Sequence, residues 1–479
     1  MQNLLVMKFG GTSMGSAERI RVAARICTEE AARRPVLAVV SAMSKVTDLL
    51  LDTLRHAEAG DDVGIDANLR ELAERHRETC RLLLNPRQRA AASSGVEALI
   101  SDFRRIAHGV RMLGERPPRS VDEAVAIGER LSALLISEYL NAEGVKARAI
   151  NGADVIVTDA VFGNATPLLE ETRKKAAHVI LPLFEEGVLP VVTGFNGATV
   201  DGRPTTLGRG GSDFSASILA SVLDAAELWI WTDVDGIMSA DPRSVPNARV
   251  LDEITYAEAA ELAYNGAKVL HPRTLAPLAE RQIPVWSKNS FALERPGTRI
   301  APAGSAASRG PKAVTSMSDV ALISIEPASA ALTGTRVMAR ALEGLAAANA
   351  EVLAFSSSSY RQSFCFLVRR DEVERVTEQL ESSLALEFGH GYLKPLDVNQ
   401  QVGLLAVVGE GMRGTPGLAG RIFKAISKQD VNIIAIAQGS SEITISIVVR
   451  RDGLERAVRA VHEECGLGAV QGAAAEQAT

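Results

Sequence analysis

From the N-terminus to about residue 300, short aliphatic and β-branched runs alternate with longer segments of helical periodicity. A helical pattern begins at about Ser16, and the clearest apolar runs are LLVMKF at 4–9, VLAVVSA at 36–42, VLPVVTGF at 188–195 and ELWIWTDVDG at 227–236. Parallel strands need long crossover connections between them, and these are usually helices. The alternation therefore predicts an α/β fold with a doubly wound, mainly parallel sheet that helices cover on both faces.

Two segments depart from this alternation. Residues from about 46 to 118 are rich in Ala, Arg, Glu and Leu at helical spacing and carry no strand signal, so we expect a helical excursion over one end of the sheet. The run RPGTRIAPAGSAASRGPKA at 295–313 concentrates Gly, Pro, Ser and Ala without apolar periodicity. We therefore expect a first domain over 1–298 and a linker over 299–316.

Beyond the linker the chain repeats a pattern. ARALEGLAAANAEVLAFSS at 339–357 and GRIFKAISKQDVNIIAIAQ at 420–438 both have the pattern of a helix, a polar turn and a strand. A strand and a loop precede each copy, and a further strand follows it. This order predicts two tandem modules, at 317–398 and 399–475, and two copies are too few for a solenoid.

Composition and charge exclude several classes of protein. The 479 residues include 52 basic and 58 acidic side chains, a net charge of −6 without a basic stripe, so we expect no nucleic-acid partner. No apolar run approaches the roughly 18 residues of a membrane span, and the N-terminus lacks a signal-peptide core. The four cysteines lie far apart, which is typical of reduced thiols. We expect a cytoplasmic protein with no membrane partner, no disulfide framework and no zinc site.

The segment KFGGTS at 8–13 lies where the first expected strand ends and a helix follows. Adjacent glycines let the backbone approach a bound group closely, and a helix N-terminus presents its unpaired amides to an anion. Lys8 can place its ammonium on the same anion, as a phosphate site requires. A plain strand-to-helix turn with a surface lysine explains this segment equally well.

Two further segments combine glycines with charged side chains. TTLGRGGSD at 205–213 contains an arginine, adjacent glycines, a serine and an aspartate, which suit a site that holds both a carboxylate and a polyphosphate. WTDVDGIMSADPR at 231–243 places aspartates in a turn after an apolar strand. A loop with a structural arginine and ordinary turn chemistry are the alternative interpretations of these two segments.

Four segments, KFGGTS, TTLGRGGSD, WTDVDG with the following DPR, and YNGAKVLHPR at 264–273, occur in this order. In that combination they closely resemble the aspartokinases of the amino acid kinase superfamily, and the two C-terminal modules look like the βαββαβ-like α+β ACT domains of the same enzymes. The resemblance implies transfer of the γ-phosphoryl group of ATP to the β-carboxylate of L-aspartate, with Mg²⁺ as a cofactor. The product would be 4-phospho-L-aspartate, from which lysine, threonine and methionine are made.

The resemblance also implies roles for individual residues. Lys8 and Asp213 would be catalytic, with Lys8 offsetting charge on the phosphoryl group in transfer. L-Aspartate would be bound by Thr47, Glu129, Arg209 and Ser212, with Glu129 on the α-ammonium and Arg209 on the α-carboxylate. Met238 stands where relatives often carry tyrosine, and no residue is expected to be a dedicated metal ligand. The contacts to ATP would come from Lys8, Gly10, Gly11, Ser13, Ser41, Gly210, Gly211, Thr232, Asp233, Met238, Arg243, Lys268 and Val269.

The segment GEGMRG at 409–414 fits the G-x-G-x-x-G fingerprint of a dinucleotide site and follows a strand. The next strand, however, ends in Gln438, where that fingerprint needs an acidic residue to bind the ribose. The second module resembles effector-responsive aspartokinase ACT domains, which implies that threonine or lysine contacts Met412, Asn432 and Gln438. The alternative is that both modules serve mainly as the interface of a homodimer or higher homo-oligomer.

Two other functions stay open at this point. Another amino acid kinase, acting on acetylglutamate or glutamate, would share the phosphate site, but those relatives lack a tandem ACT tail. A catalytically inactive amino acid sensor would not need Lys8, Arg209 and Asp213 together. Only a short run of small or polar residues follows the last expected module, so we expect no fused homoserine dehydrogenase domain.

Overall fold

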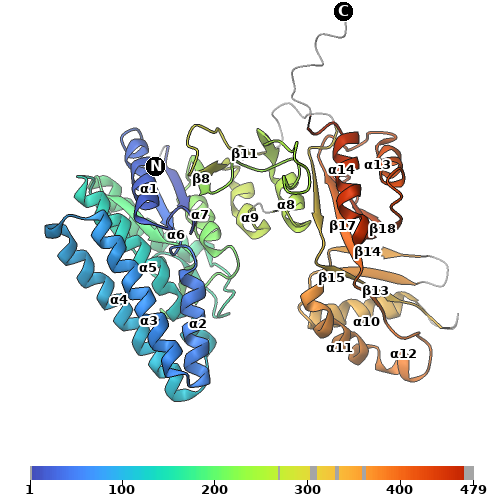
Figure 1. The fold of residues 1–479 in the computed structure, drawn as a ribbon, viewed down its shortest axis with the longest axis horizontal. Helices are drawn as coiled ribbons and strands as arrows, with labels where there is room; N and C mark the ends of the chain where they lie inside the picture. The colour runs from blue at the N-terminus through green and yellow to red at the C-terminus, as the bar shows by residue number, and fades with distance from the viewer. Residues whose placement is uncertain (1–2, 268–269, 303–309, 329–333, 359–362, 469–479) are drawn as a thin grey trace, which may run out of the picture. The chain divides into compact units, whose positions relative to one another are not determined.

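The computed structural model describes residues 3–267, 270–302, 310–328, 334–358 and 363–468. The chain forms two compact units (Figure 1). The first contains Met1–Ile237, Asp252–Tyr256 and Leu270–Pro302, and the second contains Met238–Leu251, Ala257–Val269 and Ala303–Thr479. None of the helices in the described ranges is long and apolar enough to cross a membrane.

The first unit is built on an 8-stranded sheet with the order β3-β5-β2-β1-β8-β10-β11-β9. Neighbouring strands are parallel except for the antiparallel pair β10 and β11. β1 is buried along its whole length, as expected for a strand with helices on both faces. This sheet confirms the predicted doubly wound, mainly parallel α/β class. Its strands are β1 (Leu5–Phe9), β2 (Val36–Val40), β3 (Ala147–Ile150), β5 (Leu189–Thr193), β8 (Glu227–Thr232), β9 (Glu253–Thr255), β10 (Val285–Asn289) and β11 (Thr298–Ala301).

Helices cover both faces of this sheet. On one face lie α1 (Ala17–Ala31) and α5 (Pro118–Ala142), and on the other lie α6 (Leu169–Glu185) and α7 (Gly211–Val222). α1 begins after Ser16, whose side chain accepts a hydrogen bond from the Arg19 amide at 3.3 Å, as N-cap serines do. α9 (Pro272–Arg281) packs against α7.

A helical bundle occupies one end of the first unit (Figure 1). It consists of α2 (Val46–Ala59), α3 (Asp62–Leu83), α4 (Pro86–Leu113) and the adjoining α5. Gly60 and Gly114 end α2 and α4 at φ 77° and 69°, a conformation that glycine adopts without strain. The bundle extends the apolar core of the sheet, because Phe103 of α4 belongs to the same buried cluster as Phe9 of β1. α2, α3 and α4 lie within the excursion predicted over 46–118, and α5 extends the bundle to Ala142.

A small sheet in the first unit packs against α5 and α7. It has the order β4-β6-β7, formed by β4 (Val157–Thr158), β6 (Asn196–Thr199) and β7 (Pro204–Thr206). β7 leads directly into the glycine-rich turn that precedes α7. The small sheet therefore determines where that turn begins.

The second unit contains two 4-stranded antiparallel sheets. The first sheet has the order β14-β15-β13-β16 and the second has the order β12-β17-β19-β18. Antiparallel sheets with accompanying helices agree with the predicted α+β modules. The elements of the first module are β13 (Val320–Ile325), α10 (Gly334–Ala347), β14 (Ala354–Ser357), β15 (Phe364–Arg369), α11 (Val373–Ser383), α12 (Ala385–Gly389) and β16 (Asp397–Asn399). Those of the second are β12 (Ala313–Met317), β17 (Val402–Val408), α13 (Leu418–Ser427), β18 (Ile433–Gln438), β19 (Thr444–Arg450) and α14 (Leu454–Glu464).

The second sheet takes its edge strand from the segment expected to be the linker, 299–316. β12 pairs antiparallel with β17, with Ala313 opposite Val408 and Met317 opposite Leu404. The first module is therefore inserted between β12 and β17, whereas the sequence predicts two modules in tandem. A strand of five residues shows little hydrophobic periodicity, and because it follows a Gly- and Pro-rich sequence it was predicted to be part of the linker.

Residues 238–251 and 257–269 lie in the second unit, although the sequence predicts a first domain that extends to 298. α8 (Tyr256–Tyr264) carries the buried Glu258, which accepts a hydrogen bond from the Glu410 amide at 2.8 Å and forms an ion pair with Lys312 at 3.3 Å. The Thr444 hydroxyl donates a hydrogen bond to Glu261 at 2.8 Å. These polar contacts join segments far apart in the chain, and such pairings leave no trace in local sequence patterns.

Candidate active site

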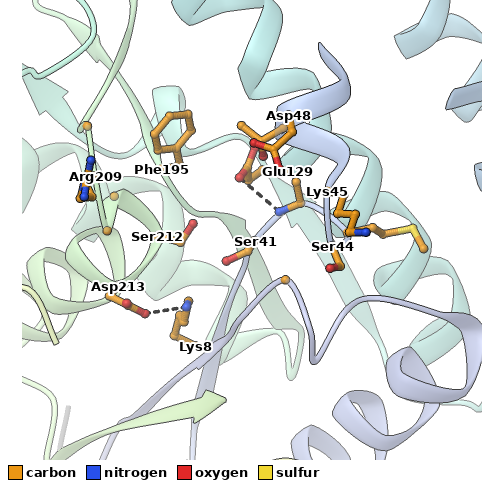
Figure 2. A pocket seen from close by; sticks show the side chains of 17 residues that line it. Lys8, Ser41, Ser44, Lys45, Asp48, Glu129, Phe195, Arg209, Ser212 and Asp213 are labelled. Carbon is orange, nitrogen blue, oxygen red and sulfur yellow. Dashed lines mark hydrogen bonds and ion pairs between the residues drawn. The ribbon is translucent and has the colours of Figure 1, made fainter. Parts of the chain in front are cut away.

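A pocket of about 490 Å³ opens at the carboxyl ends of β1 and β2 in the first unit (Figure 2). In α/β sheets, ligands bind in the crevice at this edge. Its walls come from the turns after β1 and β2, the start of α2, the middle of α5 and the turn between β7 and α7. It is lined by Lys8, Gly11, Ser41, Ala42, Met43, Ser44, Lys45, Thr47, Asp48, Glu129, Phe195, Gly208, Arg209, Gly210, Gly211, Ser212 and Asp213.

Lys8 lies on β1 and is 8% exposed. Its Nζ forms an ion pair with Asp213 Oδ1 at 2.6 Å, and Figure 2 shows both side chains on the floor of the pocket. Asp213 belongs to the first turn of α7, so one end of this pair is carried by a strand and the other by a helix. The ammonium is thus held in place before any ligand arrives.

The turn before α7 has the backbone conformation that its glycines permit. Gly208 and Gly210 adopt φ 75° and 70°, and Gly210 is the N-cap residue of α7. The first-turn amides of a helix have no partner within the helix and favour an anion. In the turn after β1, a Cβ on Gly11 would lie 3.2 Å from the Ala42 carbonyl oxygen in the turn after β2, so glycine favours the close approach of the turns after β1 and β2. The turn after β1 and the turn before α7 both line the pocket, and together they suit a phosphate group.

Glu129 is the most deeply buried acidic group of the pocket, at 3% exposure on α5. Its Oε1 accepts a hydrogen bond from the Ala42 amide at 3.2 Å, and its Oε2 has no hydrogen-bond partner among the described residues. Burial raises the pKa of Glu129 to about 8, against the opposing effects of the amide hydrogen bonds and the charge of Lys8. Such a carboxylate is stabilised by a cationic group of a ligand.

Charged groups of opposite sign face one another across the pocket. Figure 2 shows Arg209 on one side and Glu129 with Asp48 on the other, while Ser41 and Ser212 lie between them. Arg209 is exposed at the rim, on the turn that leads into α7. A guanidinium at this place can bind a carboxylate with two parallel hydrogen bonds. The pocket therefore suits a zwitterion that carries a further anionic group.

Most of the residues expected to bind substrate lie together in this pocket. The structure brings Thr47, Glu129, Arg209 and Ser212 into one lining, with the expected phosphate contacts Lys8, Gly11, Ser41, Gly210 and Gly211 and with Asp213. They come from four separate stretches of the chain, 8–11, 41–47, 129 and 209–213. Their roles stay predictions, but their common location is a finding of the structure.

Some expected ATP contacts of the first unit lie outside the pocket lining. The Gly10 amide donates a hydrogen bond to the Trp231 carbonyl at 3.1 Å, and Ser13 Oγ shares one with Ser290 Oγ at 2.8 Å. Thr232 ends β8, and its hydroxyl donates to Asp233 at 3.2 Å. These residues surround the ends of β1 and β8, next to the turn after Lys8.

The remaining expected ATP contacts lie elsewhere. Met238 and Arg243 belong to the second unit, where Met238 forms a β-bridge with Val250 and Arg243 pairs with Asp241 at 2.5 Å. Lys268 and Val269 lie outside the described residues. The part of the nucleotide site assigned to these four residues rests on the resemblance alone.

The three residues expected to contact an effector do not meet in one chain. Met412 is buried at 4% exposure in the apolar core of the second sheet. Asn432 precedes β18 and lines a cavity of about 550 Å³ with Asp430, Arg450 and Asp452. Gln438 ends β18, roughly 20 Å from Asn432 at the rise of an extended strand. A single amino acid on one protomer cannot touch both Asn432 and Gln438.

Several pocket residues were not predicted from the sequence. Phe195 adopts φ 71°, a conformation that strains a bulky residue, and its amide donates to Ser215 Oγ at 2.9 Å. Asp48 lies in the first turn of α2, one residue after the expected Thr47. The helix start in KVTDLL is the one sequence feature that could have placed Asp48 near the pocket. No local pattern predicted a role for Phe195. The other unpredicted lining residues are Ala42, Met43, Ser44, Lys45 and Gly208.

Comparisons with known families match both halves of the chain. A model of the amino acid kinase family matches residues 3–289, and a model of the ACT domain matches residues 405–465. Bifunctional aspartokinase/homoserine dehydrogenase 1 of Arabidopsis thaliana, a chloroplastic protein, is 35% identical over 464 residues, which cover 95% of this chain and 50% of that protein. The chain thus spans about half the length of such bifunctional relatives.

Solved structures match nearly the whole chain. E. coli aspartokinase III in complex with aspartate and ADP has a TM-score of 0.83 at 29% identity, over 96% of this chain and 99% of that chain. E. coli aspartokinase III in complex with lysine and aspartate has a TM-score of 0.75 at 30% identity, again over 96% and 99% of the two chains. The similarity therefore extends through both units.

Proposed function

This chain belongs to the amino acid kinase family, and because it resembles aspartokinases over nearly its whole length, we propose that it is an aspartate kinase. The reaction transfers the γ-phosphoryl group of ATP to the β-carboxylate of L-aspartate and yields 4-phospho-L-aspartate and ADP. One observation carries the proposal. The buried carboxylate of Glu129 lies across a single pocket from Arg209, and Lys8 lies at its floor.

The pocket suits the three charged groups of L-aspartate. The α-ammonium would approach Glu129 Oε2, which has no hydrogen-bond partner among the described residues. Arg209 would bind the α-carboxylate in a bidentate manner, with Thr47 and Ser212 as neutral donors. With these two ends held, the β-carboxylate is directed toward Lys8. A substrate without an α-ammonium would lack the cation that favours the ionised form of Glu129, whose pKa burial raises to about 8.

Phosphoryl transfer here needs alignment more than acid–base chemistry. The β-carboxylate of aspartate, with a pKa near about 4, is ionised at neutral pH, so no group has to remove a proton from the nucleophile. One carboxylate oxygen attacks the γ-phosphorus while the bond from that phosphorus to the β-phosphate oxygen breaks, and ADP leaves. Both reactants are anions, and Lys8 with the first-turn amides of α7 would neutralise their repulsion. Asp213 holds Lys8 in position.

Mg²⁺ is the metal that we propose to accompany ATP. Within the described ranges, no group of three or more His, Cys, Asp or Glu side chains could hold a metal ion. Mg²⁺ usually keeps several waters and is bound by one or two carboxylates together with substrate phosphates. Asp213 supplies one carboxylate on the phosphate side of the pocket. The residues thus fit a Mg²⁺ ion that enters with ATP, and bound there it would neutralise charge on the phosphates.

We also propose that an amino acid, threonine or lysine, regulates the enzyme through the second unit. The ACT family match over 405–465 supports this, and E. coli aspartokinase III has been solved with lysine bound. Assembly into a homodimer or higher homo-oligomer through the ACT modules belongs to the same proposal. The exposed Ile434 and Ile436 on the edge strand β18 support such an interface.

Aspartate-dependent formation of ADP by the purified chain tests the proposed activity. L-Aspartate, L-glutamate and N-acetyl-L-glutamate are compared as acceptors with Mg²⁺ and ATP, and we expect turnover with L-aspartate only. Arg209→Ala is expected to raise the KM for aspartate at least tenfold with little change in the KM for ATP. Turnover with either glutamate compound in place of aspartate would assign a different amino acid kinase. Absence of turnover with all three, together with binding of an amino acid, would assign an inactive sensor.

A further inference from the structure

Asp122 is a buried carboxylate that no step of the proposed reaction uses. It is 2% exposed on α5, seven residues before Glu129, and it does not line the pocket. Its Oδ2 accepts hydrogen bonds from the Gly163 amide at 2.8 Å and the Thr206 amide at 2.9 Å, and its Oδ1 accepts one from the Thr206 hydroxyl at 2.8 Å. Burial raises the pKa of Asp122 above its ordinary value, although these hydrogen bonds act in the opposite direction.

Thr206 is the residue that Asp122 holds most completely. Thr206 ends β7, and its carbonyl oxygen accepts a hydrogen bond from the Ala165 amide at 2.8 Å. The Leu207 amide that follows donates to the Phe195 carbonyl at 2.9 Å. The backbone and hydroxyl of Thr206 are therefore all engaged, only three residues before Arg209. These hydrogen bonds fix the point at which residues 207–210, the turn that carries Arg209 and is called the arginine turn below, leave the small sheet.

The loop at 159–166, which contains Gly163, is held next to Thr206 by further hydrogen bonds. Arg273 of α9 donates to the Asn164 side chain at 2.5 Å and to the Ala165 carbonyl at 3.2 Å. A Cβ on Gly208 would lie 2.6 Å from Asn164 Oδ1, so this loop packs closely against the arginine turn. Asp122 thus joins two loops to α5, which also carries Glu129.

We propose that Asp122 is a positioning residue that sets the separation between Glu129 and Arg209, and so selects the free amino acid substrate. The inference rests on the proposed function of this pocket. At 1.5 Å per residue, α5 separates Asp122 from Glu129 by roughly 10 Å along its axis. The helix acts as a rigid spacer between the group for the α-ammonium and the anchor of the group for the α-carboxylate. Arg209 is exposed and lies on a glycine-rich turn, so its own surroundings do not define its position.

A carboxylate suits this role because all three of its partners are donors. An ionised aspartate only accepts hydrogen bonds, whereas an asparagine presents two N–H donors on one side. Asp122→Asn preserves the volume but removes the charge. Its amide oxygen can keep both backbone N–H bonds only if its NH2 group replaces Oδ1, where the Thr206 hydroxyl must then accept instead of donate, so the connection to Thr206 is weakened. The expected effect is a roughly tenfold to hundredfold rise in the KM for aspartate, from the loss of charge-assisted hydrogen bonds that hold Arg209 in place. The KM for ATP is expected to change by less than about twofold, because Lys8 and α7 are untouched.

Asp159→Asn is the matched control. Asp159 lies in the same neighbouring loop and accepts hydrogen bonds from the Val161 amide at 3.1 Å and the Thr166 amide at 3.0 Å, but none from Thr206. The control should leave the KM for aspartate near that of the wild type. Thr206→Val, which loses only the hydroxyl contact, provides a milder variant and should raise the KM for aspartate less than Asp122→Asn does.

A double-mutant cycle separates positioning from general loss of structure. If Asp122 acts through Arg209, Asp122→Asn has little further effect on the KM for aspartate in the Arg209→Ala background. Equal effects in both backgrounds would overturn the proposal. Amide hydrogen exchange provides a test without turnover, since Asp122→Asn should speed exchange across 204–209 and Asp159→Asn should not. Unchanged exchange there would also overturn it, whereas an inactive wild-type chain would reject the proposed function alone.

Discussion

Glu129 combines a buried position with an incomplete set of partners. Its Oε1 accepts a hydrogen bond from the Ala42 amide, its Oε2 has no hydrogen-bond partner among the described residues, and burial raises its pKa to about 8. Sequence alone could not place this carboxylate beside Ala42, which lies 87 positions away in the chain. The residue type and its resemblance predicted the role, and the packing of α5 against β2 produced the environment.

A pH dependence of stability follows from Glu129. The folded protein holds a proton on this group between the ordinary glutamate pKa of 4.5 and about 8, while the unfolded chain releases it. The contribution to stability is therefore fully present below pH 4.5 and is lost as pH rises through 8. Glu129→Gln, which stays neutral, is expected to be more stable than the wild type at pH 8.5 by roughly 4 kcal/mol and by less than about 1 kcal/mol at pH 5. Thermal unfolding without ligands measures this, and an equal difference at both pH values would contradict it.

Lys8 supports a prediction about rate. Lys8→Ala removes the cation at the floor of the pocket, so we expect kcat to fall by about a thousandfold or more with the fold intact. Steady-state turnover and circular dichroism are the measurements. Lys174→Ala, on the exposed face of α6, is the control and should leave both unchanged. Turnover of the Lys8 variant near that of the wild type would remove Lys8 from the mechanism.

At the scale of elements, the bundle of α2 to α5 contains a buried histidine. His76 of α3 is fully buried, its Nδ1 lies 2.7 Å from the Leu72 carbonyl oxygen, and burial lowers its pKa to about 4. The folded protein therefore keeps the ring neutral while the unfolded chain binds a proton below pH 6.5. The contribution of His76 to the free energy of unfolding is fully present above pH 6.5 and is lost as pH falls toward 4. The apolar face of α3 was predictable from its periodicity, but the titration of one residue on it was not.

Replacing His76 tests this acid sensitivity of the bundle. His76→Leu is expected to flatten the decline in stability between pH 6.5 and 4.5, which His76 contributes at up to roughly 3 kcal/mol. Chemical unfolding at the two pH values measures the change. His108→Leu, at an exposed position of α4, is the matched control and should keep the wild-type pH dependence. A wild-type slope in the His76 variant would show that other groups cause the acid loss.

At the scale of the whole molecule, the structure separates two residues, Asn432 and Gln438, that were predicted to contact one effector. Asn432 lines a cavity whose walls also carry Arg450 and Asp452, and these two side chains form an ion pair with each other. Gln438 lies at the far end of β18. Both residues were predicted to contact the effector because both belong to one sequence motif, VNIIAIAQ at 431–438.

Effector binding by variants of the full chain tests this division. We expect Asn432→Ala to weaken the heat of threonine or lysine binding at least tenfold, and Gln438→Ala to change it by less than about twofold. Isothermal titration with each amino acid is the measurement. Equal losses in both variants would mean that Gln438 of a second copy completes the site. No heat with either amino acid in the wild type would leave the ACT modules as an oligomer interface.

Much of the fold and pocket was predictable because local patterns encode it. Buried apolar runs such as LLVMKF identify parallel strands, and the turns that follow them meet at one edge of a sheet. The resemblance assigned Lys8, Ser41 and Arg209, from three distant segments, to one site, and they line one pocket. By contrast, Phe195 has a strained backbone that only its surroundings impose.

By itself, the sequence determined the alternation of strands and helices, the glycine-rich turns at the strand ends and the charged groups that those turns carry. The tertiary structure alone decided that β12 completes the second sheet, that α8 belongs to the second unit and that Asp122 joins α5 to Thr206. The physical reason is the range of the interactions. Periodicity and turn chemistry act between residues a few positions apart, whereas strand pairing and buried hydrogen bonds join residues that only the folded chain brings together.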